Sequence, residues 1–509
     1  MPTYLAPGVY VEEVDSGSKP IEGVGTAIAA FVGFAKDGPV NQPVLVTNWT
    51  QFVATFGELS EEGYLGHAVY GFFQNGGGQA YVVRVNGTSS GPTTTSGTAA
   101  SAEVGQLKIS AAEPGVQGND ISVDFKAPEG EDVAEGTVDV TVRRGDEVEE
   151  YEAVPVKGRH NIVTALNRSR LVSVETEVKP SELEIPDLGT SQLAGGADPA
   201  PVPATTTITP EDYVGDVADR TGFGGLEAIP EITMVAVPDA VYAYEQGMVD
   251  LDGFKAIQLG IIAHCELMGN RMAILDTPNN LNAQQVKDWR MDQAGYDSKQ
   301  AALYYPWIDV FDPVSGGNIP LPPSGYLAGV WSRNDDTRGV HKAPANEVIR
   351  GAVDLEYHLT SKEQELLNPE GINCIRAMSG RGVRVWGART LSSDPSWRYV
   401  NIRRFFNYLE DSILLGTQWA VFEPNDQALW AKIRRSVAAF LVNEWRKGAL
   451  FGATPDEAFY VRCDDETNPA EAIDLGQVTC EIGVAPVKPA EFVIFRLAQF
   501  SGGTSLVAE

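Results

Sequence analysis

The fold class of this chain is decided by two short apolar runs, Ile232-Thr233-Met234-Val235-Ala236-Val237 and Met272-Ala273-Ile274-Leu275-Asp276. Continuous apolar runs of this length are typical of strands that are buried on both faces of a sheet. A helix-length segment from Phe254 to Leu267 separates them. Two such strands with a helix between them form a parallel pair with a crossover connection. The sequence therefore predicts an α/β domain over residues 201–370.

The segment before this domain contains elements of the same kind. An apolar stretch from Thr26 to Phe34 and the run Tyr81-Val82-Val83-Arg84-Val85 are predicted strands, and Ala68–Phe73 between them is predicted to be helical. We assign residues 26–90 to the first part of the core. The short strand Val9-Tyr10-Val11-Glu12 has no obvious partner. Residues 1–25 are therefore predicted to form an N-terminal arm.

Residues 91–200 are predicted to form an inserted, β-rich outer domain. A Ser/Thr/Gly/Pro-rich stretch from Gly87 to Ser101 marks its beginning. Short β-type runs follow at Ile121–Phe125 and Thr137–Val142, with few helix-length patterns. Residues 101–190 carry 19 acidic against 9 basic side chains, which is typical of a solvated outer surface.

The C-terminal core domain is predicted to span residues 371–487 and to contain two amphipathic helices. The first is predicted to begin at Asp394 as N-cap, with Pro395 as its first residue. The second is predicted to begin after Pro424-Asn425 and to end at Gly448. Beyond them lies a C-terminal arm, residues 488–509, in which Phe492-Val493-Ile494-Phe495 has strand propensity.

Composition excludes several classes of partner and compartment. A formal net charge of -31 opposes binding to the phosphate backbone of nucleic acid. We expect no secretory signal, because the first residues lack a basic and an apolar region, and no membrane insertion, because no run reaches the ~18 apolar residues of a span. The four cysteines lie far apart without a C-x-x-C pair, which argues against a zinc site and a dense disulfide framework and favours a reducing cytoplasm.

Motifs of enzyme sites are missing or incomplete. The five histidines contain no H-x-x-x-H spacing, and no P-loop is present. The segment Ala377–Arg381 lacks the first glycine of a nucleophile elbow, and the adjacent His264-Cys265 is expected to be a core position. The sequence thus predicts no catalytic, cofactor-binding or metal-binding residues and a protein that is not an enzyme. Four carboxylates are expected to be solvated surface: Asp335, Asp336, Asp464 and Asp465.

One region has the opposite charge to the rest of the chain. Residues 376–450 carry 12 Lys and Arg against 6 Asp and Glu. Five of these basic residues are predicted to lie on the two amphipathic helices, away from the apolar stripes: Arg403, Arg404, Lys432, Arg434 and Arg435. They form either a solvated face with intramolecular salt bridges or a docking surface for an acidic partner.

Several longer motifs resemble the tail sheath family of contractile phages, phage-tail-like bacteriocins and related injection systems. The resemblance covers roughly residues 1–90 and 370–500. The motifs that carry it are Tyr4–Glu13, Ala30–Gly33, Val385–Leu391, Trp397–Arg404, Thr417–Trp419, Phe422–Asn425 and Ala485–Phe492. The inserted segment lies outside the resemblance, so its fold and role do not follow from it.

This resemblance implies an α/β core built from N-terminal, middle and C-terminal parts, with strand-donating arms. The subunit would polymerise as a helical stack of hexameric rings around an inner tube, contact baseplate and tail terminator or cap proteins, and contract to drive the tube through a target envelope. Val9–Glu12 and Phe492–Phe495 would add strands to neighbouring subunits. The basic helix residues would face the tube or pair with the arms. Synthesis and assembly would take place in the bacterial cytoplasm, as part of a phage tail or a tail-like particle.

Two hypotheses from other classes remain open at this point. A static shell or surface-layer protein would share the terminal arms but would not contract. An α/β hydrolase is suggested by the middle domain alone, although no nucleophile is placed. Electron microscopy separates the three, because they form contractile tubes, sheets or closed shells, and monomers respectively.

Overall fold

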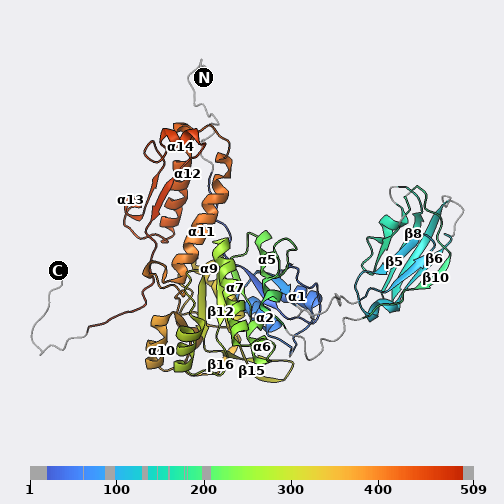
Figure 1. The fold of residues 1–509 in the computed structure, drawn as a ribbon, viewed down its shortest axis with the longest axis horizontal. Helices are drawn as coiled ribbons and strands as arrows, with labels where there is room; N and C mark the ends of the chain where they lie inside the picture. Colours follow the sequence, from blue (N-terminus) through green and yellow to red (C-terminus); the bar gives the residue numbers. More distant parts are fainter. Residues whose placement is uncertain are drawn as a thin grey trace, which may run out of the picture. The chain divides into compact units, whose positions relative to one another are not determined.

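The structure is a computed structural model that describes residues 20–60, 62–85, 98–128, 136–145, 147–158, 161–176, 178–179, 181–197 and 208–496. The chain forms two compact units (Figure 1). The first combines Met1–Gly87 with Ile208–Glu509, and the second is Thr88–Thr207. The second unit contains the segment predicted as an inserted domain. Within the described residues, no helix is long and apolar enough to cross a membrane.

An eight-stranded sheet forms the centre of the first unit, in the order β18-β17-β13-β12-β11-β1-β3-β2. The strands from β17 to β3 in this order run parallel, and β18 and β2 join the two edges antiparallel. Their bounds are β1 Ile28–Gly33, β2 Val44–Val46, β3 Gln79–Arg84, β11 Met234–Ala236, β12 Met272–Asp276, β13 Ala301–Tyr305, β17 Ile372–Met378 and β18 Gly382–Val385. The predicted parallel pair is therefore confirmed as β11 and β12.

Both faces of this sheet are covered, as the apolar strand runs require. In β1, Ala30 and Val32 belong to one buried cluster, while Ala29 and Phe31 belong to the other. Successive strand residues point to opposite faces, so a strand that is apolar throughout needs helices on both sides. The flanking helices are α1 Trp49–Phe56, α2 Leu65–Asn75, α6 Asp239–Glu245, α7 Leu251–Met268, α8 Ala283–Asp288, α9 Ser324–Arg338 and α10 Ser361–Leu367.

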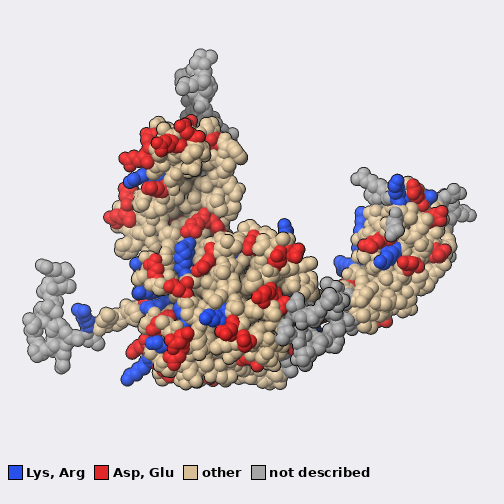
Figure 2. Space-filling model, in the orientation of Figure 1, with Lys and Arg blue, Asp and Glu red and all other residues tan. Residues whose placement is uncertain are grey.

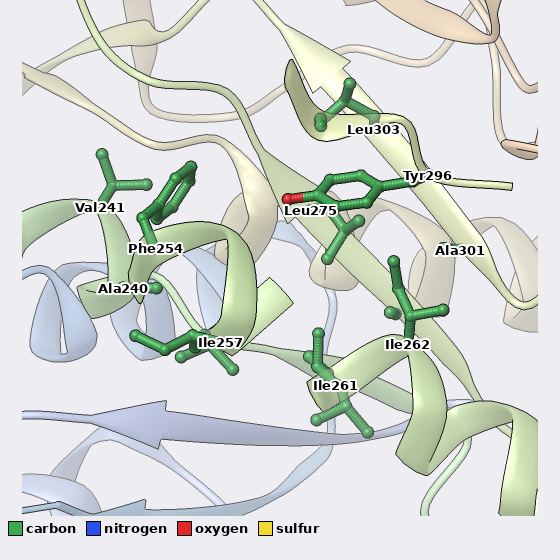
Figure 3. Close-up of a cluster of buried hydrophobic side chains, with 14 of the residues drawn as sticks. Ala240, Val241, Phe254, Ile257, Ile261, Ile262, Leu275, Tyr296, Ala301 and Leu303 are labelled. Carbon is green, nitrogen blue, oxygen red and sulfur yellow. The ribbon is translucent and has the colours of Figure 1, made fainter. Parts of the chain in front are cut away.

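One face is packed mainly by α7, the helix that connects β11 and β12. Figure 3 shows Phe254, Ile257 and Ile261 of this helix beside Leu275 of β12 and Leu303 of β13. These side chains are 3 % exposed or less. Burial of each contributes on the order of 1.5–3 kcal/mol, so this face is a main source of stability.

On the other face, α2 and α9 pack so closely that glycine is required at the contact. A Cβ at Gly329 would lie 2.4 Å from the carbonyl oxygen of Phe72, and one at Gly325 would lie 2.4 Å from the Cα of Ala68. Contacts this short with backbone atoms cannot be relieved by a side-chain rotation. The two helices are thereby held against each other above the sheet.

The C-terminal part of the first unit has its own core around two long helices, α11 Val400–Thr417 and α12 Gln427–Arg446. The prediction for α12 is confirmed, with Asp426 as N-cap and Gly448 at a φ of 80° beyond its end. The predicted start of α11 is wrong. Asp394 caps only a short 3-10 helix, Pro395–Trp397, because Thr390 N binds Arg398 O and Tyr399 pairs with Arg389 in extended form.

The predicted boundary between residues 370 and 371 does not coincide with an edge of the fold. β17 and β18 follow it in sequence, yet both belong to the eight-stranded sheet. The sheet ends at Val385, and the separate helical core begins with α11. The sequence of a single strand does not tell whether that strand continues the preceding sheet or begins another. The boundary predicted at residues 370 and 371 therefore came too early in the sequence.

Smaller elements complete the first unit. A three-stranded sheet has the order β15-β14-β16, and a two-stranded sheet pairs β19 with β20. Their bounds, with those of the remaining helices, are β14 Ile308–Asp312, β15 Gly317–Leu321, β16 Ala352–Leu355, β19 Phe459–Arg462, β20 Glu481–Val484, α4 Pro210–Val214, α5 Gly222–Gly225, α13 Pro455–Ala458 and α14 Ala470–Asp474.

The second unit is built from two antiparallel sheets around one core, as its β-rich sequence predicted. Their orders are β10-β6-β7-β8 and β4-β5-β9. In β6 and β7 every second residue is buried, so one face of the sheet is apolar. The bounds are β4 Ser101–Val104, β5 Leu107–Ala111, β6 Ile121–Lys126, β7 Thr137–Arg144, β8 Glu147–Pro155, β9 Val172–Glu175 and β10 Gly189–Gln192, with one short helix, α3 Ile162–Leu166.

Candidate assembly surfaces

The C-terminal segment is tied to the first unit up to Glu491. Val487 N donates to Ala449 O at 3.2 Å. Glu491 is then held by Arg389, through Nε to Oε1 at 2.9 Å and Nη2 to Oε2 at 2.6 Å. Asn368 and Tyr399 donate to the same carboxylate at 2.9 and 3.1 Å. Burial alone would raise the pKa of Glu491, but these donors outweigh it and lower the pKa. We call this cluster the Glu491 anchor.

Immediately beyond the anchor, four large apolar side chains are exposed. Phe492, Val493, Ile494 and Phe495 have exposed fractions of 73, 68, 79 and 85 %. They have no secondary structure in the described chain, although their sequence has strand propensity. This segment extends away from the body of the first unit (Figure 1). A run of consecutive exposed apolar residues is a feature of interaction sites rather than of free surfaces.

The sheet of β19 and β20 has two open edges. Each strand pairs only with the other among the described residues, in the antiparallel register Phe459↔Val484 to Arg462↔Glu481. One face lies against α12 through the apolar cluster that contains Leu441. A two-stranded sheet is marginally stable, and its unpaired N–H and C=O groups can accept further strands.

At the other end of the chain, residues 20–27 run along α11. Thr26 Oγ1 donates to Asp335 at 2.7 Å, and its carbonyl accepts from Arg404 at the start of the helix. Val24 N donates to Ser412 Oγ at 3.1 Å, and Ile21 packs against Gly416 near the helix end. Residue 20, where the described chain begins, therefore lies near the C-terminal end of α11. The Glu491 anchor contacts Tyr399 and so lies at the N-terminal end of the same helix. The predicted arm residues Val9, Tyr10, Val11 and Glu12 lie outside the described residues.

Two of the predicted surface arginines are buried. Arg404, 4 % exposed, forms a bidentate ion pair with Asp335 at 2.9 and 2.6 Å, and its guanidinium lies over the ring of Trp331 at 4.8 Å. Arg403, 3 % exposed, donates to Asn407 at 2.7 Å and to Glu410 at 3.0 Å. The expectation of an exposed basic face is wrong at both positions.

Asp335 is correspondingly not the solvated carboxylate that was expected. Its side chain is 3 % exposed. Its partner lies 69 residues away in sequence, on α11, whereas Asp335 lies on α9. The pair therefore joins the helical core to the sheet. Sequence contained no signal for this, because helical spacing identifies apolar faces but not which charges pair across them.

The other three predicted basic residues are exposed on α12: Lys432, Arg434 and Arg435. Arg434 Nη1 donates to the carbonyl of Cys463 at 3.1 Å, so it is committed to the end of β19. Lys432 and Arg435 are three positions apart and are neighbours on one face of the helix. Among the described residues neither has a hydrogen bond or ion pair. Figure 2 shows many acidic side chains on the surface around α14.

Buried polar groups elsewhere have structural roles. Within the described residues, no group of three or more His, Cys, Asp or Glu is placed to hold a metal ion. His264 and Cys265 are core positions, as expected, and His264 contacts Arg271 at 3.0 Å. Asp239 accepts the backbone N–H groups of Phe34, Tyr64 and Leu65, and burial raises its pKa to about 7.

Comparison with known proteins gives a consistent family. The sequence model described as phage tail sheath protein central domain matches residues 254–391, and that of the phage tail sheath C-terminal domain matches residues 392–500. The tail sheath protein of Burkholderia phage BcepMu is 24% identical over 96% of this chain and 95% of its own length. A putative prophage major tail sheath protein of Pseudomonas aeruginosa is 28% identical over 44% of this chain and 57% of its own length.

Solved structures share the fold over nearly the full chain. The contracted helical sheath of the anti-feeding prophage has a TM-score of 0.59 at 24% identity, covering 98% of this chain and 100% of that one. A sheath tail protein of Listeria innocua has a TM-score of 0.58 at 15% identity, covering 92% and 97%. Together with the family matches, these likenesses show that this chain belongs to the contractile tail sheath family and is a structural protein rather than an enzyme.

Proposed function

We propose that this chain is the sheath subunit of a phage tail or phage-tail-like particle, which polymerises as stacked hexameric rings around an inner tube and contracts to drive that tube through a target envelope. Its partners are copies of itself, the inner tube protein, a baseplate and a terminator or cap protein. Structures similar to this chain come from a sheath, in a contracted state, and from a baseplate assembly, which supports contacts with further copies and with a baseplate.

The observation that carries the proposal is a match between open strand edges and terminal segments with strand propensity. The β19–β20 sheet has two open edges, and the chain has two terminal segments with strand propensity. In each subunit the sheet accepts arms of its neighbours. The Glu491 anchor directs Phe492–Phe495 away from its own body, so this segment pairs with another copy.

Strand addition makes use of the exposed apolar residues. In an extended arm, Phe492 and Ile494 point to one face and Val493 and Phe495 to the other. The face that turns toward the acceptor's core buries two large side chains, worth on the order of 3–6 kcal/mol together. Main-chain hydrogen bonds along the open edge add to this and set the register.

The points at which the described chain leads into the two arms fit a connected mesh. These points lie near opposite ends of α11, an 18-residue helix of about 27 Å at 1.5 Å per residue. Each subunit therefore reaches different neighbours with its two arms. Such links persist while the bodies of the subunits slide and rotate, so contraction is a transition between two packings and needs no bound nucleotide.

Electron microscopy of the purified chain tests this proposal. We expect full-length protein to form tubes with a lumen, and a variant truncated after Glu491 to remain a folded monomer. A variant truncated after Arg496 keeps the apolar segment and is the matched control, which should still assemble. Sheets or closed shells would support a static shell instead, and tubes from the chain that ends at Glu491 would refute strand exchange.

A further inference from the structure

Two cysteines that are far apart in sequence meet at the end of the acceptor sheet. The register of β19 and β20 pairs Arg462 with Glu481, so the next pair is Cys463 and Cys480. The two thiols are close enough to affect each other's pKa. Cys463 is fully buried, whereas Cys480 is half-buried. Both are free thiols in this structure.

The ladder places this pair in the geometry that suits a disulfide. Ala485 N donates to Ala458 O at 2.9 Å, so Ala458 and Ala485 are a hydrogen-bonded pair of the same register. Hydrogen-bonded and non-hydrogen-bonded pairs alternate, which makes Cys463 and Cys480 a non-hydrogen-bonded pair. In such pairs the Cα atoms lie about 4.5 Å apart and the side chains are closest. This distance is within the range of about 4.4–6.8 Å that a disulfide spans.

A buried asparagine holds the two strand ends together. Asn468, 2 % exposed, donates to Thr479 O at 3.0 Å and accepts from Thr479 N at 2.6 Å. Its amide also contacts Cys463 Sγ at 3.9 Å. Arg434 on α12 fixes the carbonyl of Cys463. Cys463 and Cys480 are therefore held opposite each other by these contacts as well as by the pairing of β19 with β20.

We propose that Cys463 and Cys480 form a reversible disulfide that closes the segment between β19 and β20 once the protein meets an oxidising medium. The oxidant is a low-molecular-weight disulfide. The thiolate of the more accessible Cys480 attacks it, forming a mixed disulfide and releasing one small thiol. Cys463 then loses its proton and attacks the Cys480 sulfur, which releases the second small thiol. Two protein thiols are oxidised, and one small disulfide is reduced.

The closed loop contains residues 464–479, including α14, and lies beside the open strand edges. Cross-linking restricts this segment and holds the two acceptor strands in register. In a reducing cytoplasm the two cysteines remain free thiols, so the disulfide forms only in protein that has left the cytoplasm. Burial raises the pKa of both thiols, to about 12 for Cys480, so closure is slow at neutral pH. Cys265 and Cys374 are buried in the sheet domain and have no such partner among the described residues.

Mass spectrometry of the full chain tests this inference independently of polymerisation. The protein is incubated with oxidised glutathione at pH 8, unfolded in the presence of a maleimide, and cleaved with trypsin. Both cysteines lie in one tryptic peptide, residues 463–496, because Lys488 precedes proline. We expect this peptide to lack both maleimide groups and to be lighter by two hydrogen atoms. Cleavage after Glu466 and Glu471 should leave two fragments joined until reductant is added.

Variants provide the controls. Cys463→Ser should convert Cys480 to a stable glutathione adduct, because the second thiol is missing. Asn468→Ala should slow formation of the Cys463–Cys480 disulfide several-fold. In unfolded protein, Cys480 of this variant should react with the maleimide as it does in wild type. Glutathione adducts on wild-type Cys480 that never convert to the internal disulfide would overturn the proposal, as would full maleimide labelling after prolonged oxidation.

Discussion

Arg389 and Glu491, 102 residues apart in sequence, form a bidentate ion pair with oxygen–nitrogen distances of 2.9 and 2.6 Å. Arg389 follows the eight-stranded sheet, and Glu491 immediately precedes the exposed run Phe492–Phe495. The guanidinium also donates to the carbonyl of Asn368 at 3.0 Å. The arm therefore leaves the body at a defined point, which limits the positions that its apolar residues reach.

Loss of the Glu491 charge should release the arm without unfolding the subunit. Hydrogen bonds to charged groups contribute about 1.5–3 kcal/mol, so we expect Glu491→Gln to lower the free energy of unfolding by no more than this. Tube formation should require severalfold more protein. Urea denaturation and sedimentation of assembled material measure the two effects. Glu471→Gln, at an exposed position on α14, is the control and should change neither.

The same contact should respond to acid. Because the pKa of Glu491 is lowered in the folded chain, its stabilising contribution is complete above the unfolded value of about 4.3 and is lost as the pH falls through the lower folded value. Wild type and Glu491→Gln should therefore differ in stability at pH 6 and converge below about pH 4. A difference that does not shrink as the pH falls below about 4 would show that the anchor does not depend on the carboxylate charge.

Removal of Arg404 should be among the most damaging single changes to a basic residue. It would leave the buried carboxylate of Asp335 without its ion-pair partner, which typically costs about 3–5 kcal/mol. We predict this loss for Arg404→Met in urea denaturation. Arg435→Met removes the same charge from an exposed position of α12 and should shift the free energy of unfolding by no more than about 0.5 kcal/mol. Equal effects of the two substitutions would contradict the assignment of Arg404 to the core.

These residues show where sequence patterns suffice and where they do not. The strands and α12 followed from apolar runs and capping residues, which are local signals. The burial of Arg404 depends on Asp335, and the Glu491 anchor on Arg389; both pairs form only after distant segments have packed. Cys463 and Cys480 become neighbours only through the register of β19 and β20. The wide spacing of the four cysteines argued against a dense disulfide framework. It could not show that two of them face each other, because the register is unknown until the strand pairing is known.

Asp276 should make stability depend on pH in the opposite sense from Glu491. It is buried at the end of β12, accepts Ser324 N at 2.9 Å, and burial raises its pKa to about 7. Its contribution to stability is complete below the unfolded pKa of about 3.9 and is lost as the pH rises toward 7. Asp276→Asn should therefore show a shallower fall in the free energy of unfolding between pH 5 and 8. If the free energy of unfolding fell equally with pH in wild type and Asp276→Asn, the raised pKa of Asp276 would be contradicted.

The charge of Arg496 should determine to which edge of the β19–β20 sheet the C-terminal arm adds, and in which direction. Arg496 follows the apolar run, and both Arg496 and Glu481, the first residue of β20, are exposed. Antiparallel addition to β20 brings Arg496 beside Glu481, whereas parallel addition to β19 brings it beside Arg462. We therefore predict that Arg496→Glu weakens tube formation and that Glu481→Arg in the same chain restores it. Failure of restoration, with both single variants folded, would exclude this arrangement but not strand exchange itself.

The exposed pair on α12 is the remaining candidate for contact with the inner tube. Lys432 and Arg435 are neighbours on one helix face, and the structure leaves both side chains exposed, unlike Arg403 and Arg404. An exposed ion pair is worth only about 0.2–1 kcal/mol. In the proposed assembly, repetition around each ring and along the tube would multiply this weak contact, yet each pair would separate easily when contraction begins.

We predict that Lys432→Glu combined with Arg435→Glu leaves the subunit folded but yields empty or contracted sheath when tube is supplied. The reason is that acidic groups on the tube would then repel the reversed charges, while the arms and the β19–β20 sheet are unchanged. Lys108→Glu with Arg168→Glu makes the same change in net charge on the second unit and should still give tube-filled, extended sheath. Electron microscopy of sheath assembled with and without tube measures the outcome. Complete loss of polymers would instead assign the pair to contacts with the arms, and normal filled sheath from the α12 variant would exclude both roles.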